Sequence, residues 1–214
     1  MTIDEVNACL PGCVQLTEYK YHLLSLYLDE MLQWNKKINL TAIKDKNLCW
    51  QKHIIDSLLL GEFIDEDKKL LDVGSGAGFP SIPLKVVFPG LKITSVDTVG
   101  KKIKFQKHCV RKFDLKEFVP LSLRIEQLEE STSELFEQVT SRAFSSLLQF
   151  CQLCSQYVTV GGKLIAMKGA DYQREIDEAE PVLLQLGLTI INVDTRELLP
   201  GKEIRAFVTI ERKV

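Results

Sequence analysis

One glycine-rich stretch of the chain reads Leu70-Leu71-Asp72-Val73-Gly74-Ser75-Gly76-Ala77-Gly78-Phe79-Pro80. A short apolar run leads into an acidic residue and then into glycines at every second position. Glycine is needed where the backbone takes a positive φ or approaches a ligand closely. A proline fits the first turn of a helix, whose N–H groups have no partner within the helix. The stretch therefore predicts a strand, a glycine turn and a helix N-terminus, the nucleotide-binding corner of a doubly wound α/β sheet. A glycine turn that binds nothing is the alternative.

The spacing of the glycines indicates which nucleotide is bound. The dinucleotide fingerprint G-x-G-x-x-G/A needs a small residue at its third position, where the helix packs close to the strand. Counted from Gly74 and Gly76, that position is Phe79, a bulky ring. The pattern D-x-G-x-G-x-G instead resembles the first motif of S-adenosylmethionine (SAM) methyltransferases. Asp97 ends the next expected strand, where a carboxylate can accept hydrogen bonds from ribose hydroxyls. That acid serves either class of cofactor.

Composition limits the possible classes of protein. The 214 residues are 45% hydrophobic and carry a net charge of −2, so one sizeable core is expected and any contact with nucleic acid must be local. Six cysteines without a signal peptide indicate reduced thiols in a cytosol. Cys151 and Cys154 form a C-x-x-C pair within a helical pattern, so we expect packing rather than zinc or redox chemistry. No apolar run reaches 18 residues, and no membrane span or metal site is expected.

The first sixty residues are expected to be helical. Thr17 is a plausible N-cap, and apolar residues at helical spacing continue to about Trp34. A second helix is expected from about Asn47 to Gly61. It carries His53 and Asp56 on one face, which we interpret as a surface pair at a domain junction rather than a catalytic dyad. We expect residues 1–60 to form a helical cap and residues 61–214 to form the cofactor-binding domain.

Strands and helices alternate from Lys69 onward, which indicates a mostly parallel sheet. The expected strands are 69–74, 92–97, 118–123, 138–141, 163–167, 188–194 and 204–211, and the expected helices are 80–88, 100–113, 146–158 and 171–186. The fifth strand follows a turn at Gly161-Gly162. The last two strands are joined by Leu199-Pro200-Gly201-Lys202, which is too short for a parallel crossover. An antiparallel hairpin ending a parallel sheet is the methyltransferase arrangement, whereas the dinucleotide-binding fold lacks it.

Ligands of such sheets bind beyond the carboxyl ends of the strands. Ile125 or a neighbour can supply an apolar wall for adenine. Arg142 can pair with a carboxylate or phosphate, or serve as a structural partner of Asp72 or Glu126. Lys168 can reach a phosphate or be solvated, and Phe144 can stack on a base or belong to the core.

A local basic surface is expected beside Asp97. Six basic residues without an acidic residue among them fall within one expected helix: Lys101, Lys102, Lys104, Lys107, Arg111 and Lys112. Phosphate contacts of this kind give affinity without sequence choice. A merely solubilising face is the alternative.

Four motifs together resemble one known family: residues 72–80, Asp97 with Gly100-Lys101-Lys102, Ser141-Arg142-Ala143-Phe144, and Met167-Lys168-Gly169. This is the bacterial small-subunit rRNA methyltransferase G family, also called glucose-inhibited division protein B. Residues 34–41 and 53–57 are similar to its N-terminal signatures. Ser81 and Thr98 depart from the family pattern, where glycine and serine are usual.

The resemblance implies a Rossmann-like class I methyltransferase with a seven-stranded sheet, acting on a guanine N7 of 16S rRNA with SAM as cofactor. A SAM site is expected from Gly74, Gly76, Gly78, Phe79, Asp97, Ile125, Glu126 and Arg142. RNA contacts are expected from Lys101, Lys102, Lys104, Lys107, Arg111, Arg142 and Lys168. A cytoplasmic location and a monomer are favoured.

Guanine N7 has a lone pair and no proton to lose, so no catalytic base is nominated and catalysis by orientation is expected. Three alternatives stay open. They are a SAM enzyme for a small molecule, a non-catalytic RNA-binding or assembly factor, and an NAD-dependent oxidoreductase, which Phe79 and the final hairpin disfavour.

Overall fold

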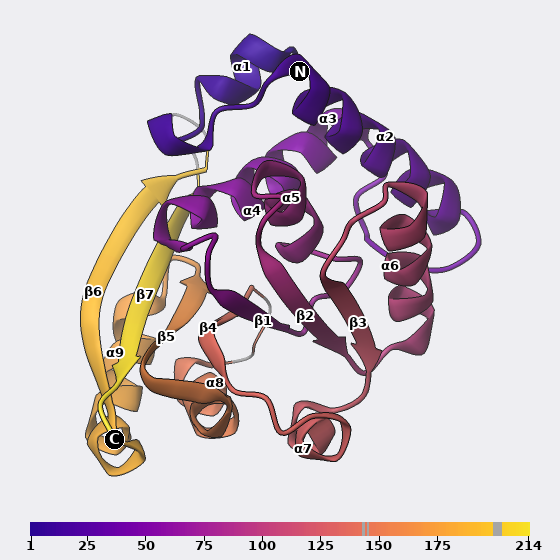
Figure 1. The fold of residues 1–214 in the computed structure, drawn as a ribbon. Coiled ribbons are helices and arrows are strands. Elements are labelled where there is room, and N and C mark those ends of the chain that lie inside the picture. The colour runs from indigo at the N-terminus through magenta and orange to yellow at the C-terminus, as the bar shows by residue number, and fades with distance from the viewer. Residues whose placement is uncertain (143, 145, 199–202) are drawn as a thin grey trace.

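The computed structural model describes residues 1–142, 144, 146–198 and 203–214. Its centre is a seven-stranded sheet in the order β3-β2-β1-β4-β5-β7-β6 (Figure 1). The strands are β1 Lys69–Val73, β2 Lys92–Asp97, β3 Phe118–Ser122, β4 Phe136–Ser141, β5 Val158–Lys168, β6 Leu188–Glu197 and β7 Ile204–Arg212. The first five run parallel, and β7 lies antiparallel between β5 and β6. The expected fold class is confirmed. The expected turn at 199–202 lies outside the described residues.

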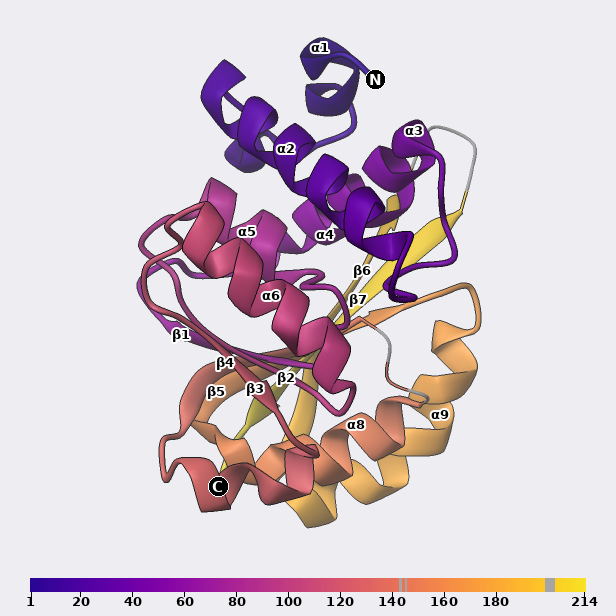
Figure 2. The ribbon, with the colours of Figure 1, turned by 90° about the vertical axis from the view of Figure 1, so that its right-hand side faces the viewer.

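Helices cover both faces of this sheet. They are α1 Ile3–Asn7, α2 Glu18–Asn35, α3 Lys46–Cys49, α4 Asp56–Leu59, α5 Ser81–Val87, α6 Gly100–Lys112, α7 Leu128–Ser131, α8 Leu147–Cys154 and α9 Tyr172–Leu183. A π-helical turn, Trp50–Ile55, joins α3 to α4, so the expected second helix is present with an irregular centre. Figure 2 shows α2, α5 and α6 on one side of the sheet and α8 and α9 on the other.

The strands place alternate side chains on these two faces. Leu70 belongs to the hydrophobic cluster under α2, α5 and α6, whereas its neighbour Leu71 belongs to the cluster under α8 and α9. In β5, Ile165 and Leu164 divide in the same way. This is the period of two that a strand buried on both faces requires.

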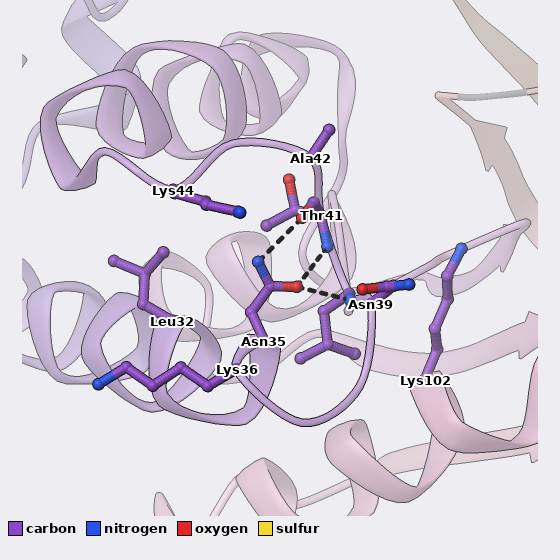
Figure 3. Close-up of a pocket in the computed structure, with 9 residues that line it drawn as sticks. Leu32, Asn35, Lys36, Asn39, Thr41, Ala42, Lys44 and Lys102 are labelled. Atoms are coloured by element: carbon purple, nitrogen blue, oxygen red, sulfur yellow. Dashed lines mark hydrogen bonds between the residues drawn. The ribbon is translucent and has the colours of Figure 1, made fainter.

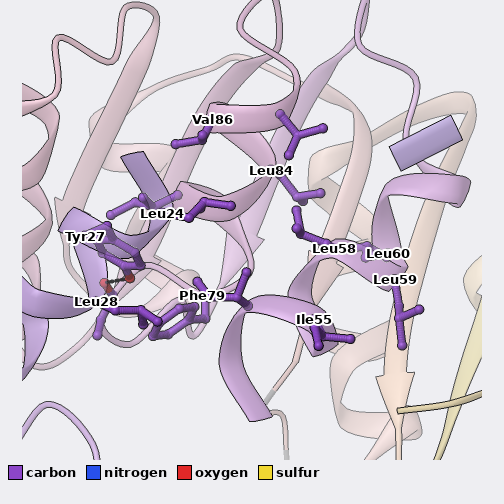
Figure 4. Packing of buried hydrophobic residues seen from close by; sticks show 14 of the residues in the cluster. Leu24, Tyr27, Leu28, Ile55, Leu58, Leu59, Leu60, Phe79, Leu84 and Val86 are labelled. Carbon is purple, nitrogen blue, oxygen red and sulfur yellow. Dashed lines mark hydrogen bonds between the residues drawn. The ribbon is translucent and has the colours of Figure 1, made fainter. Parts of the chain in front are cut away.

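The N-terminal helices share the first of these clusters (Figure 4). Thr17 caps α2 by accepting from the Lys20 N–H, as expected. The apolar residues expected at helical spacing form one stripe of α2 that is fully buried: Leu24, Tyr27, Leu28 and Met31. Tyr27 also donates its hydroxyl to the Ala77 carbonyl at 2.8 Å, which ties α2 to the glycine turn. The division into domains at residue 60 stays a prediction.

The expected turn before the fifth strand is wrong. Gly161 and Gly162 lie inside β5, where the pairing with β4 shifts from Phe136–Val158 to Gln138–Lys163. Gly161 has a φ of +76°, and a Cβ on Gly162 would lie 2.9 Å from the Glu137 carbonyl. The two glycines therefore lie at a bulge-like irregularity within β5, and the chain does not reverse direction there.

Candidate active site

The glycine turn folds over the carboxyl ends of β1 and β2. The N–H of Gly74 donates to the Val96 carbonyl at 2.8 Å, and the N–H of Gly76 donates to Oδ2 of Asp97 at 2.8 Å. The other oxygen of Asp97 accepts from the Val99 N–H at 2.7 Å. Asp97, expected to face a ribose, therefore also holds the turn in shape.

A buried polar network supports the turn from below. The Gln106 amide of α6 donates to the Gly76 carbonyl at 2.7 Å and to the Ser75 hydroxyl at 2.8 Å. Ser95 of β2 donates to the same amide's oxygen at 2.7 Å. Such a satisfied network fixes one conformation.

Gly74 and Gly76 have φ values of +77° and +58°. A Cβ on Gly76 would meet no atom within 4 Å, so the upper side of the turn faces open space rather than packed protein. This is the backbone that a ligand can approach closely.

Two cavities meet at this turn, and Gly74 lines both. The first, of about 310 Å³, extends from Asp97 and Thr98 to Ile125 and Glu126. Ile125 is buried and supplies the expected apolar wall, together with Leu153. A cavity of this size, with the acidic residues Asp97 and Glu126 beside an apolar wall, suits a nucleoside.

The second cavity is smaller, about 150 Å³, and the Phe79 ring forms part of its lining. The His53 ring stacks on Phe79 with centroids 4.6 Å apart, and the Arg142 guanidinium lies 5.0 Å from the ring centre. Thr41 and Lys102 complete the charged and polar part of the wall. Burial, and next the charge of Arg142, lower the pKa of His53 to about 4, so its ring is neutral at physiological pH.

The partner of Arg142 is Asp56, at 3.3 Å, and Asp56 also accepts from Arg205 of β7 at 2.6 Å. The interpretation of His53 and Asp56 as a surface pair is wrong, because Asp56 is only 2% exposed. The expected structural partners of Arg142, Asp72 and Glu126, form no ion pair with it. The whole of α4 is buried, and Asp56 joins it to Arg142 and Arg205, tertiary contacts that sequence spacing does not show.

Two buried polar atoms at this corner have no hydrogen-bond partner among the described residues, Oδ1 of Asp72 and Oγ of Ser141. A Cβ on Gly74 would lie 4.0 Å from that Ser141 oxygen. The other Asp72 oxygen accepts a hydrogen bond from Ser81, one of the two residues noted above as departing from the family pattern. Burial, opposed by this Ser81 bond, raises the pKa of Asp72 to about 7.

The structure divides the expected RNA-binding residues into three groups. Lys101, Lys104, Lys107 and Arg111 are exposed on α6 and form no ion pair with any residue that the structure describes. Lys102 lines the second cavity with Arg142. Lys168 is buried, and its ammonium group forms an ion pair with Glu175 at 2.7 Å. The expectation that Lys168 contacts RNA is therefore wrong, and so is the alternative that it is solvated.

Other expected residues lie as follows. A Cβ on Gly78 would lie 2.5 Å from Ile82, so this glycine serves helix packing. Phe144 lines the first cavity and packs on Phe150, with ring centroids 5.8 Å apart. Ala143 of the same motif lies outside the described residues. Sequence reasoning did not identify Leu40 and Thr41 as cavity residues, although they belong to the stretch 34–41 that resembles an N-terminal signature of the family.

Cys151 and Cys154 are buried in α8, and burial raises the pKa of Cys151 to about 12. Their expected packing is confirmed. No group of three or more potential metal ligands occurs within the described residues. In the same part of the chain, every helix is too short or too polar to cross a bilayer.

Comparison with known proteins identifies relatives over almost the whole chain. A family model described as rRNA small subunit methyltransferase G matches residues 20–197. The Ribosomal RNA small subunit methyltransferase G of Geobacter sulfurreducens is 39% identical, covering 92% of this chain and 91% of that protein. The Bacillus cereus protein of the same name is 36% identical, covering 100% and 91%.

Solved structures show the same fold. An rRNA methylase from Streptococcus thermophilus matches with a TM-score of 0.54 at 16% identity, covering 75% of this chain and 94% of that one. A SAM dependent methyltransferase from Aquifex aeolicus matches with a TM-score of 0.56 at 19% identity, covering 76% and 92%. At such low identity these two structures bear on the fold alone.

Proposed function

We propose a function for this chain on the premise that it belongs to the rRNA small subunit methyltransferase G family, as its relatives show. The chain is an rRNA methyltransferase of the small ribosomal subunit. We propose further that SAM is the methyl donor, that 16S rRNA is the substrate and that the N7 of one guanine is the acceptor. The observation that carries this is the pair of cavities meeting at Gly74, one shaped for a nucleoside and one beside Phe79 and Arg142.

The residues present fit SAM. The first cavity offers Asp97 for ribose hydroxyls and Ile125 for adenine, while the positive-φ glycines let the backbone approach the amino-acid part. Arg142 can pair with a carboxylate of the ligand. The lone oxygens of Asp72 and Ser141 give the corner two unused acceptors. SAM, when bound, supplies an electrophilic methyl group on a sulfonium.

The second cavity carries no free general base among its described lining residues. The imidazole of His53 is a weak base, because burial and the charge of Arg142 lower its pKa to about 4, and its Nε2 already shares a 2.8 Å hydrogen bond with the Thr41 hydroxyl. Lys102 and Arg142 are cations. Such a site suits a nucleophile that loses no proton, as guanine N7 does, and the protein's part is to orient it. Phe79 is already stacked on His53, so the shape of the cavity is fixed by its own rings.

The exposed lysines of α6 begin at the same corner, so RNA held on α6 reaches the cavities directly. We propose that the N-terminal cap helps to form this substrate side. We propose a cytoplasmic location, which a ribosomal substrate supports.

The test offers purified protein and labelled SAM to small ribosomal subunits from cells that lack this methylation. We expect label in one guanine of 16S rRNA, mapped by strand cleavage specific for N7-methylguanosine, with transfer falling steeply as salt rises. Label found only on small molecules would favour a small-molecule enzyme. SAM uptake absent from calorimetry, with rRNA still bound, would favour a non-catalytic RNA-binding factor.

A further inference from the structure

A third and larger cavity, of about 820 Å³, opens beside the second. It lies between the C-terminal end of α2, the segment that follows it as far as Lys44, and Lys102 near the start of α6 (Figure 3). We call it the α2–α6 groove. None of its lining except Lys102 belongs to the site residues expected from the sequence.

The groove is positively charged. Its lining includes the side chains of Lys36, Lys44 and Lys102, and no Asp or Glu is among its described lining residues. Figure 3 shows Lys44 on the loop side of the groove and Lys102 rising from α6 opposite it. These three lysines form no ion pair within the described part of the chain, whereas the nearby Lys46 and Lys112 are paired with Asp29 and Glu30. Unpaired cations around one hollow attract a polyanion.

The groove continues into the second cavity. Leu40, Thr41 and Lys102 line both, so a chain lying in the groove can place one unit beside Phe79. At about 820 Å³ it is within the size range of ligand sites, about 300–1,000 Å³, whereas the second cavity at about 150 Å³ takes only part of a ligand. The two sizes suit a target base in the second cavity and the neighbouring nucleotides in the groove.

Hydrogen bonds from Asn35 fix the loop that forms one wall of the groove. Asn35, at the end of α2, accepts from the N–H groups of Leu40 and Thr41 at 2.8 and 3.1 Å and donates to the Thr41 carbonyl at 2.9 Å. Thr41 in turn contacts His53, which stacks on Phe79. One asparagine thus sets the loop against both cavities.

We propose that the α2–α6 groove binds the single-stranded RNA that flanks the target nucleotide, with Lys36 and Lys44 on its phosphates and apolar Leu32 and Leu40 beneath a base. This rests on the proposed function. RNA is favoured over an acidic protein because the groove shares Leu40, Thr41 and Lys102 with the cavity in which we propose the target base to lie, and its lysines can neutralise the phosphates on either side of that base.

The test measures three quantities for the double variant Lys36→Ala/Lys44→Ala: RNA affinity, SAM affinity and methyl transfer. The matched control is Lys163→Ala, an exposed lysine in β5 paired in register with Gln138, toward the end of the sheet away from the site. The RNA probes are a fluorescent single-stranded oligonucleotide and unmethylated small subunits. Both groove lysines are exposed, so the fold should be kept, and unchanged SAM binding by calorimetry verifies this.

We expect the double variant to bind the oligonucleotide roughly 10–100-fold more weakly, with SAM affinity unchanged. The slope of log K against log salt concentration should become shallower by about 1.4, or about 0.7 for each phosphate that a lysine no longer neutralises. Lys163→Ala should bind as the unaltered protein does. Equal oligonucleotide binding by both variants would overturn the proposal, and so would a defect seen with subunits alone, which would indicate a ribosomal protein in the groove. If the double variant binds RNA more weakly but the unaltered protein transfers no methyl group to subunits, the proposal that the groove binds RNA is supported and the proposed function is refuted.

Discussion

Asp72 lies at the end of β1, fully buried, and has no ion pair among the described residues. Its pKa of about 7 in the folded protein is well above the value of 3.8 that it has when exposed. Between pH 4 and pH 7 the unfolded chain releases this proton while the folded chain keeps it. Stability is therefore lost as pH rises through that window, and the loss is complete above about pH 7.

Asp72→Asn removes this dependence, since an amide keeps an oxygen for Ser81 and carries no charge. We expect the variant to gain stability relative to the unaltered protein between pH 5 and pH 8, by on the order of 1–4 kcal/mol. Urea unfolding at both pH values measures this difference. A gap that is the same at pH 5 and pH 8 would show that Asp72 is ionised in the folded protein at both.

Sequence reasoning at this scale depended on position along the strands. Asp97 and Ile125 line the first cavity as expected, because Asp97 ends one strand and Ile125 follows another, and both strand ends are visible in the sequence. The partner of Arg142 was not predicted, because Asp56 is 86 residues away in the sequence and reaches Arg142 only when α4 packs in the folded protein. Lys168 was misjudged for the same reason, since Glu175 covers it after α9 packs.

The helix α2 binds the sheet through a stripe of buried side chains. Leu24 is fully buried and Leu26, two residues along, is 40% exposed. We expect Leu24→Ala to cost about 2–5 kcal/mol, because it opens a cavity in the cluster shared with α5 and α6. Leu26→Ala is the matched control and should cost less than about 1 kcal/mol. Denaturant unfolding compares the two, and equal losses would contradict the docking of α2 by this face.

The strands and helices were the most predictable part of this protein. The expected bounds of β2 and α6 agree with the structure to within one residue, since each is a strongly periodic segment with clear ends. The exceptions have local causes. Gly161 and Gly162 punctuate the sequence like a turn, but their neighbours on both sides pair with β4 and carry the strand through.

At the scale of the whole molecule, the described residues form two hydrophobic clusters, and the first unites the N-terminal helices with one face of the sheet. Tyr27 packs on Phe79 and Phe105, with centroids 5.4 and 6.0 Å away, so the cap fills space directly over the glycine turn and α6. We expect a chain of residues 61–214 alone to lack a cooperative thermal transition and to bind a hydrophobic dye, because that face of the sheet loses its cover. The complete chain is the control, followed by circular dichroism. A sharp transition together with SAM binding in the shortened chain would establish residues 61–214 as an independent domain.

The second cavity is lined by residues from five separate stretches of the chain, 40–41, 53, 74–79, 102 and 142. While the protein is being synthesised, the stretch bearing Arg142 leaves the ribosome last of these, and β5 and β7 emerge later still. A chain that ends before Arg142 therefore lacks one side of the second cavity, and we expect such a product to transfer no methyl group to the small subunit.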